Sequence, residues 1–339
     1  MNQAVNHPPG SVQTVDYHTA GEPLRIVTGG LPLLEGETML AKRRHMAEHH
    51  DHWRRLLMRE PRGHADMYGA VLTEPVSDDG DTGVLFLHNE GYSTMCGHGI
   101  IALVHAGVEQ GLFPIADPAE IRFDTPAGRV TAKAHFDKQG KVASASFRNV
   151  PSFILEPEFS VRLDGKTVDT TIAFGGAFYA YVDARPHQLS LVPDEAPRII
   201  ELGRRIKQKV AMHCDIIHPD GGEDLDFLYG TIFYLPGAGR LEQKNVCVFA
   251  DGQLDRSPTG TGVSGWSAIR CLRGEVELGE QLTIESIIGT RFTCRCLEKT
   301  LVGGQSAVIT EVAGSASRTG EHRFFLDPND PLQQGFNLR

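Results

Sequence analysis

The sequence predicts a mixed α/β fold of the α+β type, built from two halves of similar design. Segments typical of strands outnumber helical segments and do not alternate strictly with them, which disfavours a purely doubly wound sheet. A small reactive or hydroxylic residue, a Gly-x-Gly turn and a mostly apolar helix occur once in each half. The stretch NVPSFI followed by EPEF, near residue 150, indicates the boundary between the halves.

Nine short runs, rich in alternating or β-branched residues, are predicted to be strands. They are LRIVTGG (24–30), GVLFLHN (83–89), RVTAKAHF (129–136), KVASASFRNV (141–150), YAYVDA (179–184), FLYGTIFYL (227–235), NVCVFA (245–250), RFTCRCL (291–297) and SAVITEVAG (306–314).

Four segments are predicted to be helices: 38–57, the segment after Cys96, 197–212 and the segment after Thr259. The two that follow Gly-x-Gly turns are apolar nearly all round, so both should be buried. Gly111 and Gly274 stand where these two helices should end, and glycine readily takes the left-handed conformation that closes a helix.

Composition excludes several classes of protein. The 339 residues are 40% hydrophobic and 22% charged, enough for two globular domains with real cores. The net charge of -10 argues against nucleic-acid and anionic-membrane surfaces. The start, MNQAVNHPPGSVQ, has no apolar signal region, and no run approaches a membrane span. Six widely spaced cysteines indicate reduced thiols, so a cytoplasmic protein is expected.

The segment DRSPTGTGVSGWSAIRCL (255–272) contains G-x-G-x-x-G, a pattern found in dinucleotide-binding proteins. Here DGQLDRSPT separates the glycines from the preceding strand, whereas that motif needs a tight strand-to-helix turn. A dinucleotide site is therefore disfavoured. The glycines instead offer free N–H groups at a helix N-terminus, and CGHG offers the same in the first half. Two such ends facing each other would hold a carboxylate.

Cys96 stands at one of these helix N-termini, where the helix dipole should depress its pKa and favour the thiolate. A thiolate there could act as a base or a nucleophile. The alternative is a small buried core residue, the usual fate of a lone cysteine. Packing is the expected role of the other five: Cys214, Cys247, Cys271, Cys294 and Cys296.

The histidines of RRHMAEHHDHWRR resemble a metal site only in spacing. His45, His49 and His52 follow at intervals of four and three residues, but the H-E-x-x-H order is missing and the segment is charged on nearly every side. A solvated helix face is the better interpretation, and no metal is expected.

At MCGHG and DRSPTGTG the sequence strongly resembles the proline racemase family. YHTAGEPLRIV, REPRGHADMYGAVLTEP, FRNVPSF and AFGGAFYAYVDA are similar to it too, so the resemblance covers nearly the whole chain. It implies a diaminopimelate epimerase-like fold: two similar domains, each a curved sheet around a central helix, with the active site in the cleft between them. The domains would span 10–150 and 151–324, with 325–339 returning to the first. No cofactor is implied.

Racemases of this family carry two catalytic cysteines, on opposite faces of the substrate's α-carbon. Cys96 matches the first, but Thr259 stands at the second. A threonine hydroxyl is a far weaker acid than a thiol, so two-base epimerisation should be crippled. The threonine form resembles the family's trans-3-hydroxy-L-proline dehydratases. In that substrate the C2 hydrogen and the C3 hydroxyl share a face, so Cys96 alone could serve as base in a syn elimination.

The resemblance also implies the binding roles. Backbone N–H groups of Gly97, His98, Gly260 and Thr261 would hold the carboxylate and stabilise the charge that develops on it. His98 and Asp255 would contact the ring nitrogen, although Asp255 could instead be a turn residue before the helix. Thr259 would fill space or form a hydrogen bond. The enamine product would tautomerise to Δ1-pyrroline-2-carboxylate.

Three alternatives remain at this point. A 4-hydroxyproline 2-epimerase or proline racemase would exchange the α-proton and invert it without losing water. An isomerase of the phenazine-biosynthesis type would share the fold but not need Cys96. An inactive amino-acid-binding homologue would bind without turnover. In each case the expected partner is a small molecule, either hydroxyproline or a proline analogue. A homodimer is the oligomeric state that we consider.

Overall fold

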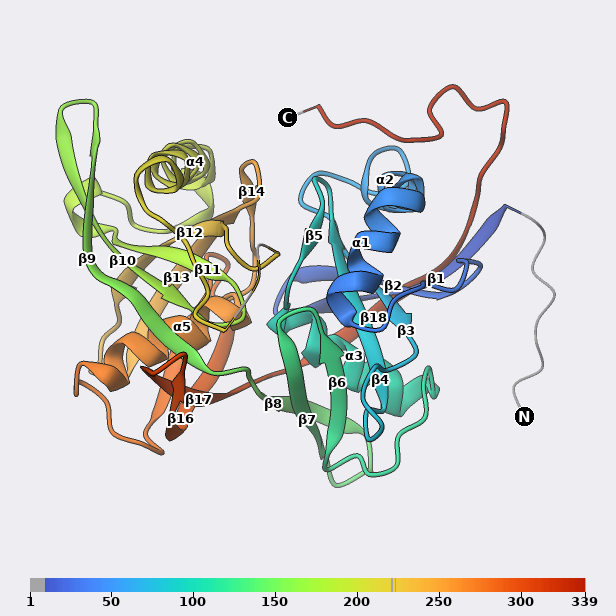
Figure 1. The fold of residues 1–339 in the computed structure, drawn as a ribbon, viewed down its shortest axis with the longest axis horizontal. Coiled ribbons are helices and arrows are strands. Elements are labelled where there is room, and N and C mark those ends of the chain that lie inside the picture. Colours follow the sequence, from blue (N-terminus) through green and yellow to red (C-terminus); the bar gives the residue numbers. More distant parts are fainter. Residues whose placement is uncertain (1–9, 221, 223, 339) are drawn as a thin grey trace.

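Two lobes lie side by side, each formed by a curved sheet wrapped around one helix (Figure 1). The computed structural model describes residues 10–220, 222 and 224–338. We call residues 10–150 with 316–338 the N-lobe, and residues 151–314 the C-lobe. The prediction that the N-terminal segment has no signal region concerns mainly residues 1–9, which lie outside the described residues. Within the described residues, no helix is long and apolar enough to cross a membrane.

The N-lobe contains three helices and nine strands within the described residues. In chain order they are β1 (Ser11–Thr19), β2 (Glu22–Gly29), α1 (Met39–His49), α2 (Asp51–Met58), β3 (Tyr68–Thr73), β4 (Thr82–His88), β5 (Tyr92–Ser93), α3 (Gly97–Gln110), β6 (Ile121–Thr125), β7 (Gly128–Phe136), β8 (Val142–Arg148) and, after the C-lobe, β18 (Ala316–Phe325).

The C-lobe repeats this plan. Its elements are β9 (Ser152–Leu163), β10 (Lys166–Phe174), β11 (Phe178–Asp183), the short 3-10 helices η1 (Arg185–His187) and η2 (Pro193–Glu195), α4 (Ala196–His213), β12 (Leu228–Pro236), β13 (Glu242–Phe249), β14 (Gln253–Leu254), α5 (Gly260–Leu272), β15 (Gln281–Glu285), β16 (Arg291–Val302) and β17 (Gln305–Gly314).

Strand pairing shows that the halves are copies of one design. In the N-lobe β2 pairs in parallel with β3, and β4 with β6, while β1–β2, β3–β4, β6–β7 and β7–β8 are antiparallel. The C-lobe has the same pattern, with β11–β12 and β13–β15 parallel and β10–β11, β12–β13, β15–β16 and β16–β17 antiparallel. The predicted mixed α/β fold of two similar halves is confirmed.

The two central helices lie within the last parallel crossover of each lobe, α3 between β4 and β6 and α5 between β13 and β15. Every residue from 97 to 107 is buried, and so is almost all of α5. Gly111 ends α3 in the left-handed conformation at φ 64°. Gly274, at φ 73°, follows α5, and its N–H and that of Glu275 bond to carbonyls of the last turn. The predicted burial of both helices and their closing glycines are confirmed.

The predicted single helix over 38–57 is wrong, because it is two helices. His50, at φ -131° and ψ 12°, leaves the helical conformation; its N–H closes α1 and its carbonyl starts α2. After this break α2 turns Trp53, Leu56 and Leu57 into a core beside β3 and β4.

Several strands were not predicted. The largest are β1, β9, β10 and β18, whose faces carry many polar residues. They are held by pairing with partners distant in the sequence, as β1 is with β18. Such segments show little alternation of apolar and polar residues, so the sequence alone does not reveal them as strands.

Two segments connect the lobes: the link from β8 to β9 near residue 150, and the link from β17 to β18 (Figure 1). The domain division predicted from the sequence stays a proposal. Because β18 pairs with β1 along its whole length, we propose that the C-terminal return to the first domain begins at about residue 316 rather than 325.

Candidate active site

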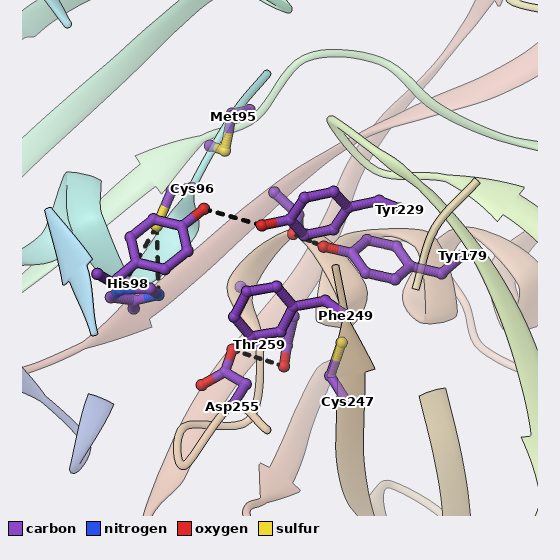
Figure 2. Close-up of a pocket in the computed structure, with 13 residues that line it drawn as sticks. Met95, Cys96, His98, Tyr179, Tyr229, Cys247, Phe249, Asp255 and Thr259 are labelled. Carbon is purple, nitrogen blue, oxygen red and sulfur yellow. Dashed lines mark hydrogen bonds between the residues drawn. The ribbon is translucent and has the colours of Figure 1, made fainter. Parts of the chain in front are cut away.

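A small cavity lies between the N-termini of α3 and α5, with walls from both lobes (Figure 2). Its volume is about 20 Å³. The N-lobe contributes Tyr68, Met95, Cys96, Gly97 and His98. The C-lobe contributes Tyr179, Tyr229, Cys247, Phe249, Asp255, Thr259, Gly260 and Thr261. All seven site residues predicted from the sequence therefore line one cavity, although their roles stay predictions.

The backbones of the two helix N-termini are in close contact, and glycine makes this contact feasible. A Cβ on Gly97 would lie 2.6 Å from the Gly260 Cα, and a Cβ on Gly260 would lie 2.7 Å from the Gly97 Cα. The first N–H groups of a helix have no partner inside it, so two sets of donors converge here. Both helix dipoles also favour negative charge at this point. The arrangement suits a carboxylate.

Cys96 caps its own helix. It lies outside the helical conformation, at φ -145° and ψ 108°, and its Sγ accepts a hydrogen bond from the Gly99 N–H at 3.2 Å. The His98 ring lies against the same sulfur, with 3.2 Å between Sγ and Nδ1. Cys96 is thus held at the cavity wall by two contacts from the first turn of α3.

The predicted depression of the Cys96 pKa is wrong for this structure. Burial raises the pKa of the thiol well above its usual value, and the Gly99 N–H only partly opposes this. The carboxylates of Asp255 and Glu22 raise it further. The helix terminus acts in the expected direction, but desolvation between the closed lobes outweighs it. Cys96 is therefore protonated at neutral pH in this state.

His98 is a neutral ring at pH 7, because burial lowers its pKa to about 4. The Asp255 carboxylate and the Pro23 carbonyl oppose this shift only in part. A neutral imidazole has one acceptor nitrogen, and Nδ1 lies at hydrogen-bonding distance from the Cys96 Sγ. The β1–β2 turn also holds His98, since the Thr19 hydroxyl donates to the His98 carbonyl at 2.8 Å.

Thr259 occupies the corresponding position before α5 but is oriented differently. Its backbone is left-handed, at φ 67° and ψ 93°, a rare conformation for a β-branched residue. Its hydroxyl donates to Asp255 Oδ2 at 2.8 Å rather than bonding to its own helix. The Ser257 hydroxyl accepts its N–H at 3.1 Å, and its carbonyl accepts from Val263. Surrounding bonds therefore hold this strained residue in place.

Asp255 is buried, with 4% of its surface exposed, and lines the cavity. Its Oδ1 accepts the Ser257 N–H at 2.7 Å and its Oδ2 accepts the Thr259 hydroxyl. The turn role and the site role foreseen from the sequence are thus geometrically compatible. The carboxylate is oriented by the turn that precedes α5 while it faces the cavity.

Arg256 ties this turn to the N-lobe. Its backbone N–H and its Nε reach Oε2 of Glu22 at 2.8 and 3.1 Å. Glu22 is fully buried, and burial raises the pKa of its carboxyl well above the usual value. This contact holds Arg256, the residue after Asp255, in place, and it joins the two lobes beside the cavity.

Aromatic residues close the remaining walls and were not predicted as site residues. The hydroxyls of Tyr68 and Tyr229 meet across the lobes at 3.1 Å, and the Tyr179 hydroxyl lies 2.7 Å from Thr261 Oγ1. Tyr68 and Tyr179 fall in stretches already noted for their family resemblance, which was the available signal. Cys247, expected only to pack, also lines the cavity.

The histidines of α1 and α2 do not line this cavity. The rings of His45 and His49 lie 4.9 Å apart, and both belong to α1 on the N-lobe. The described residues contain no group of three or more His, Cys, Asp or Glu side chains that could hold a metal ion.

The chain is similar to known proteins over nearly its whole length. The proline racemase family model matches residues 14–337. A trans-3-hydroxy-L-proline dehydratase of Colwellia psychrerythraea is 45% identical over 332 residues, covering 97% of this chain and 93% of that protein. A 3-hydroxyproline 2-epimerase of Burkholderia multivorans is 46% identical over 332 residues, covering 97% and 98%.

Among solved structures, a hydroxyproline epimerase from Agrobacterium vitis with bound trans-4-hydroxy-L-proline superposes with a TM-score of 0.90. It is 29% identical in sequence, and the match covers 97% of this chain and 96% of that one.

Proposed function

This chain belongs to the proline racemase family, and we propose that it is the enzyme that removes water from trans-3-hydroxy-L-proline. The observation that carries the proposal is the asymmetry of the cavity. One wall presents the Cys96 thiol, whereas the opposite wall presents a Thr259 hydroxyl whose proton is directed to Asp255. A single base on one face fits an elimination better than a direct two-thiol inversion.

We propose that the substrate carboxylate binds between the two helix N-termini. Backbone N–H groups of Gly97, His98, Gly260 and Thr261 would donate to its oxygens. The ring ammonium would lie against Asp255 and His98, with the C2 hydrogen facing Cys96. Since room for about one water is available in a cavity of 20 Å³, the lobes must separate to admit this ligand.

Binding would also prepare the base. A ring ammonium beside Cys96 favours the charged thiolate, because an opposite charge a few ångströms away lowers the pKa of a thiol. It would also offset the Asp255 carboxylate, which raises the Cys96 pKa in the closed lobes. The thiol is therefore expected to ionise in the complex more readily than in the free enzyme.

The reaction then proceeds on one face. The Cys96 thiolate takes the C2 proton, and the C2–H electron pair becomes the C2=C3 double bond. The C3–O bond breaks, and the hydroxide leaves as water with the proton now on Cys96, which restores the thiolate. Helix N–H groups stabilise the charge that builds on the carboxylate. The enamine released tautomerises to Δ1-pyrroline-2-carboxylate.

The test is to incubate the purified protein, after dialysis against EDTA, with a panel of proline derivatives. Imine should form from trans-3-hydroxy-L-proline without added metal or cofactor. Inversion of 4-hydroxyproline or proline as the dominant reaction, without loss of water, would favour the epimerase alternative. Ligand-induced stabilisation with no turnover of any derivative would favour an inactive binding protein.

A cytoplasmic location and a homodimer also stay proposals. The six cysteines, all free in the structure, suit a reducing compartment. Cell fractionation and light scattering of the purified protein test the two proposals.

A further inference from the structure

The β1–β2 turn, residues 19–23, belongs to the N-lobe but is bonded to the C-lobe beside the cavity. The Ala20 carbonyl accepts the Thr290 hydroxyl at 2.7 Å. Glu22 is fully buried, and its Oε2 accepts the Arg256 backbone N–H at 2.8 Å and lies 3.1 Å from the Arg256 Nε. One short turn therefore brings a carboxylate of the N-lobe onto the loop that leads into α5.

The Glu22–Arg256 ion pair is poorly suited to stabilising the fold. Glu22 Oε1 has no hydrogen-bond partner among the described residues, which leaves one oxygen of a buried carboxylate unsatisfied. Removing two charges from water also costs about as much as their attraction returns. Since two apolar side chains could join the lobes equally well, the position of this pair points to a functional role.

Groups of the N-lobe bind the guanidinium of Arg256, the residue next to Asp255. Besides the contact with Glu22, its Nη2 donates to the Asp66 carbonyl at 3.1 Å, and its Nη1 lies 3.7 Å from Asp66 Oδ2. The Asp255 carboxylate accepts hydrogen bonds from two neutral donors of its own turn. The negative charge of Asp255 is therefore left for a cation that enters the cavity.

The same turn reaches the other residue that we propose to contact the ring nitrogen. The Thr19 hydroxyl donates to the His98 carbonyl at 2.8 Å. His98 and Asp255 line the cavity from opposite lobes (Figure 2). The β1–β2 turn is thus bonded to His98 through Thr19 and to the residue after Asp255 through Glu22.

We propose that Glu22 and Arg256 are positioning residues that allow Asp255 to recognise the ring ammonium of the substrate. Glu22 holds the Arg256 guanidinium on the N-lobe side, so that it does not compete with the ammonium for Asp255. Through the same turn, Glu22 sets the distance between Asp255 and His98 when the lobes close. The inference rests on the proposed function, which places the ring nitrogen against these two residues.

The experiment compares two ligands that differ in the ring heteroatom. L-Proline carries the ring ammonium, whereas (S)-tetrahydrofuran-2-carboxylate has a neutral oxygen in its place. Calorimetric titration measures the Kd of both ligands for wild type, Glu22→Gln, Glu22→Asp and Arg256→Lys. Asp16→Asn is the matched control, since Asp16 forms a buried ion pair with Arg25 at 2.8 Å but does not line the cavity. Thermal unfolding and dehydration of trans-3-hydroxy-L-proline are recorded for every variant.

Wild type and the control should bind L-proline more tightly than the oxygen analogue. Glu22→Gln and Arg256→Lys should weaken L-proline about tenfold or more and the analogue about twofold or less, because only L-proline uses the Asp255 charge. A lysine cannot reach Glu22 and Asp66 together as the guanidinium does. Glu22→Asp keeps the charge and should lie between wild type and Glu22→Gln. It decides the matter together with Arg256→Lys if Glu22→Gln does not fold.

Equal weakening of both ligands, or unchanged affinity for L-proline in the folded variants, overturns the positioning role. Equal affinity of wild type for the two ligands overturns it as well, because the ammonium would then not be recognised. Dehydration by wild type still supports the proposed function in these cases, whereas its absence would refute that function separately.

Discussion

The starts of α3 and α5 occupy equivalent places in two copies of one fold, yet they present different chemistry. Cys96 has an extended backbone, and its sulfur stays with its own helix through the Gly99 N–H. Thr259 has a left-handed backbone, and its hydroxyl turns to Asp255 instead. One start therefore presents the thiol that we propose as the base, and the other orients a carboxylate. A duplicated fold can thus divide reaction and recognition between its halves by changing one side chain and its neighbours.

The largest effect is expected from the α3 side of this comparison. Cys96→Ala should lower dehydration of trans-3-hydroxy-L-proline about 10³-fold or more, because it removes the proposed base on the reacting face. Steady-state imine formation measures the loss, and Cys214→Ser, at a partly buried cysteine outside the cavity, should retain wild-type activity. Cys96→Ser tests whether acidity matters as well as shape. Near wild-type turnover by the serine variant would show that Cys96 is not the base.

The contact between the two helix starts gives the next effect. Gly97→Ala would place a methyl group 2.6 Å from the Gly260 Cα, so the lobes could no longer close to the same geometry. A displacement of this kind should lower kcat about 100-fold. Gly91→Ala is the matched control, since its new methyl would meet only His88, at 3.8 Å. Equal activity in both variants would show that close approach of the helices is not needed.

Replacing Thr259, at the start of α5, by cysteine should have a smaller effect. Thr259→Cys places a thiol directly at the wall opposite Cys96, in place of a hydroxyl that is no useful acid by itself. Inversion of L-proline and of cis- and trans-4-hydroxyproline should rise about tenfold over wild type. The gain stays this small because a new thiol also needs a suitable pKa and supporting contacts. Optical rotation and chiral chromatography measure it. No gain in a folded variant would mean that the residue at 259 does not separate the two activities.

The pH profile should show the smallest effect. Burial raises the pKa of Cys96, and a base must be deprotonated to act, so kcat/KM should be low at acid pH and still rising above neutrality. In the complex proposed above the substrate ammonium should lower that pKa, so the acid limb of kcat should lie at lower pH than that of kcat/KM. Stopped assays across pH measure both limbs. Coincident limbs, or a kcat/KM that is flat from acid to neutral pH, would argue against an ionising Cys96.

Local patterns were enough to predict part of this arrangement. The Gly-x-Gly turns, the apolar helices and the closing Gly111 are all written in short stretches, and they located Cys96 and Thr259 at opposing helix starts. The features that were missed depend on contacts between distant segments. Tyr68 meets Tyr229 only when the lobes come together, and the Glu22–Arg256 pair joins residues from two lobes.

The Cys96 pKa shows the same limit in electrostatic terms. The helix N-terminus is visible in the sequence, so its lowering effect could be predicted. The opposing desolvation comes from residues of both lobes packed around the thiol, and no local pattern reports it. The break at His50 is similar, since a continuous periodic segment does not reveal where the core redirects the chain.

The most direct test of the one-face elimination is to compare the two 3-hydroxy-L-prolines as substrates for dehydration. Imine formation is followed with wild type for trans-3-hydroxy-L-proline, whose C2 hydrogen and hydroxyl share a face, and for cis-3-hydroxy-L-proline, where they do not. The account predicts that the trans isomer loses water about 100-fold faster or more, because only there can one thiol reach both groups. Comparable loss of water from the cis isomer would contradict it, since the hydroxyl would then leave from the face opposite Cys96.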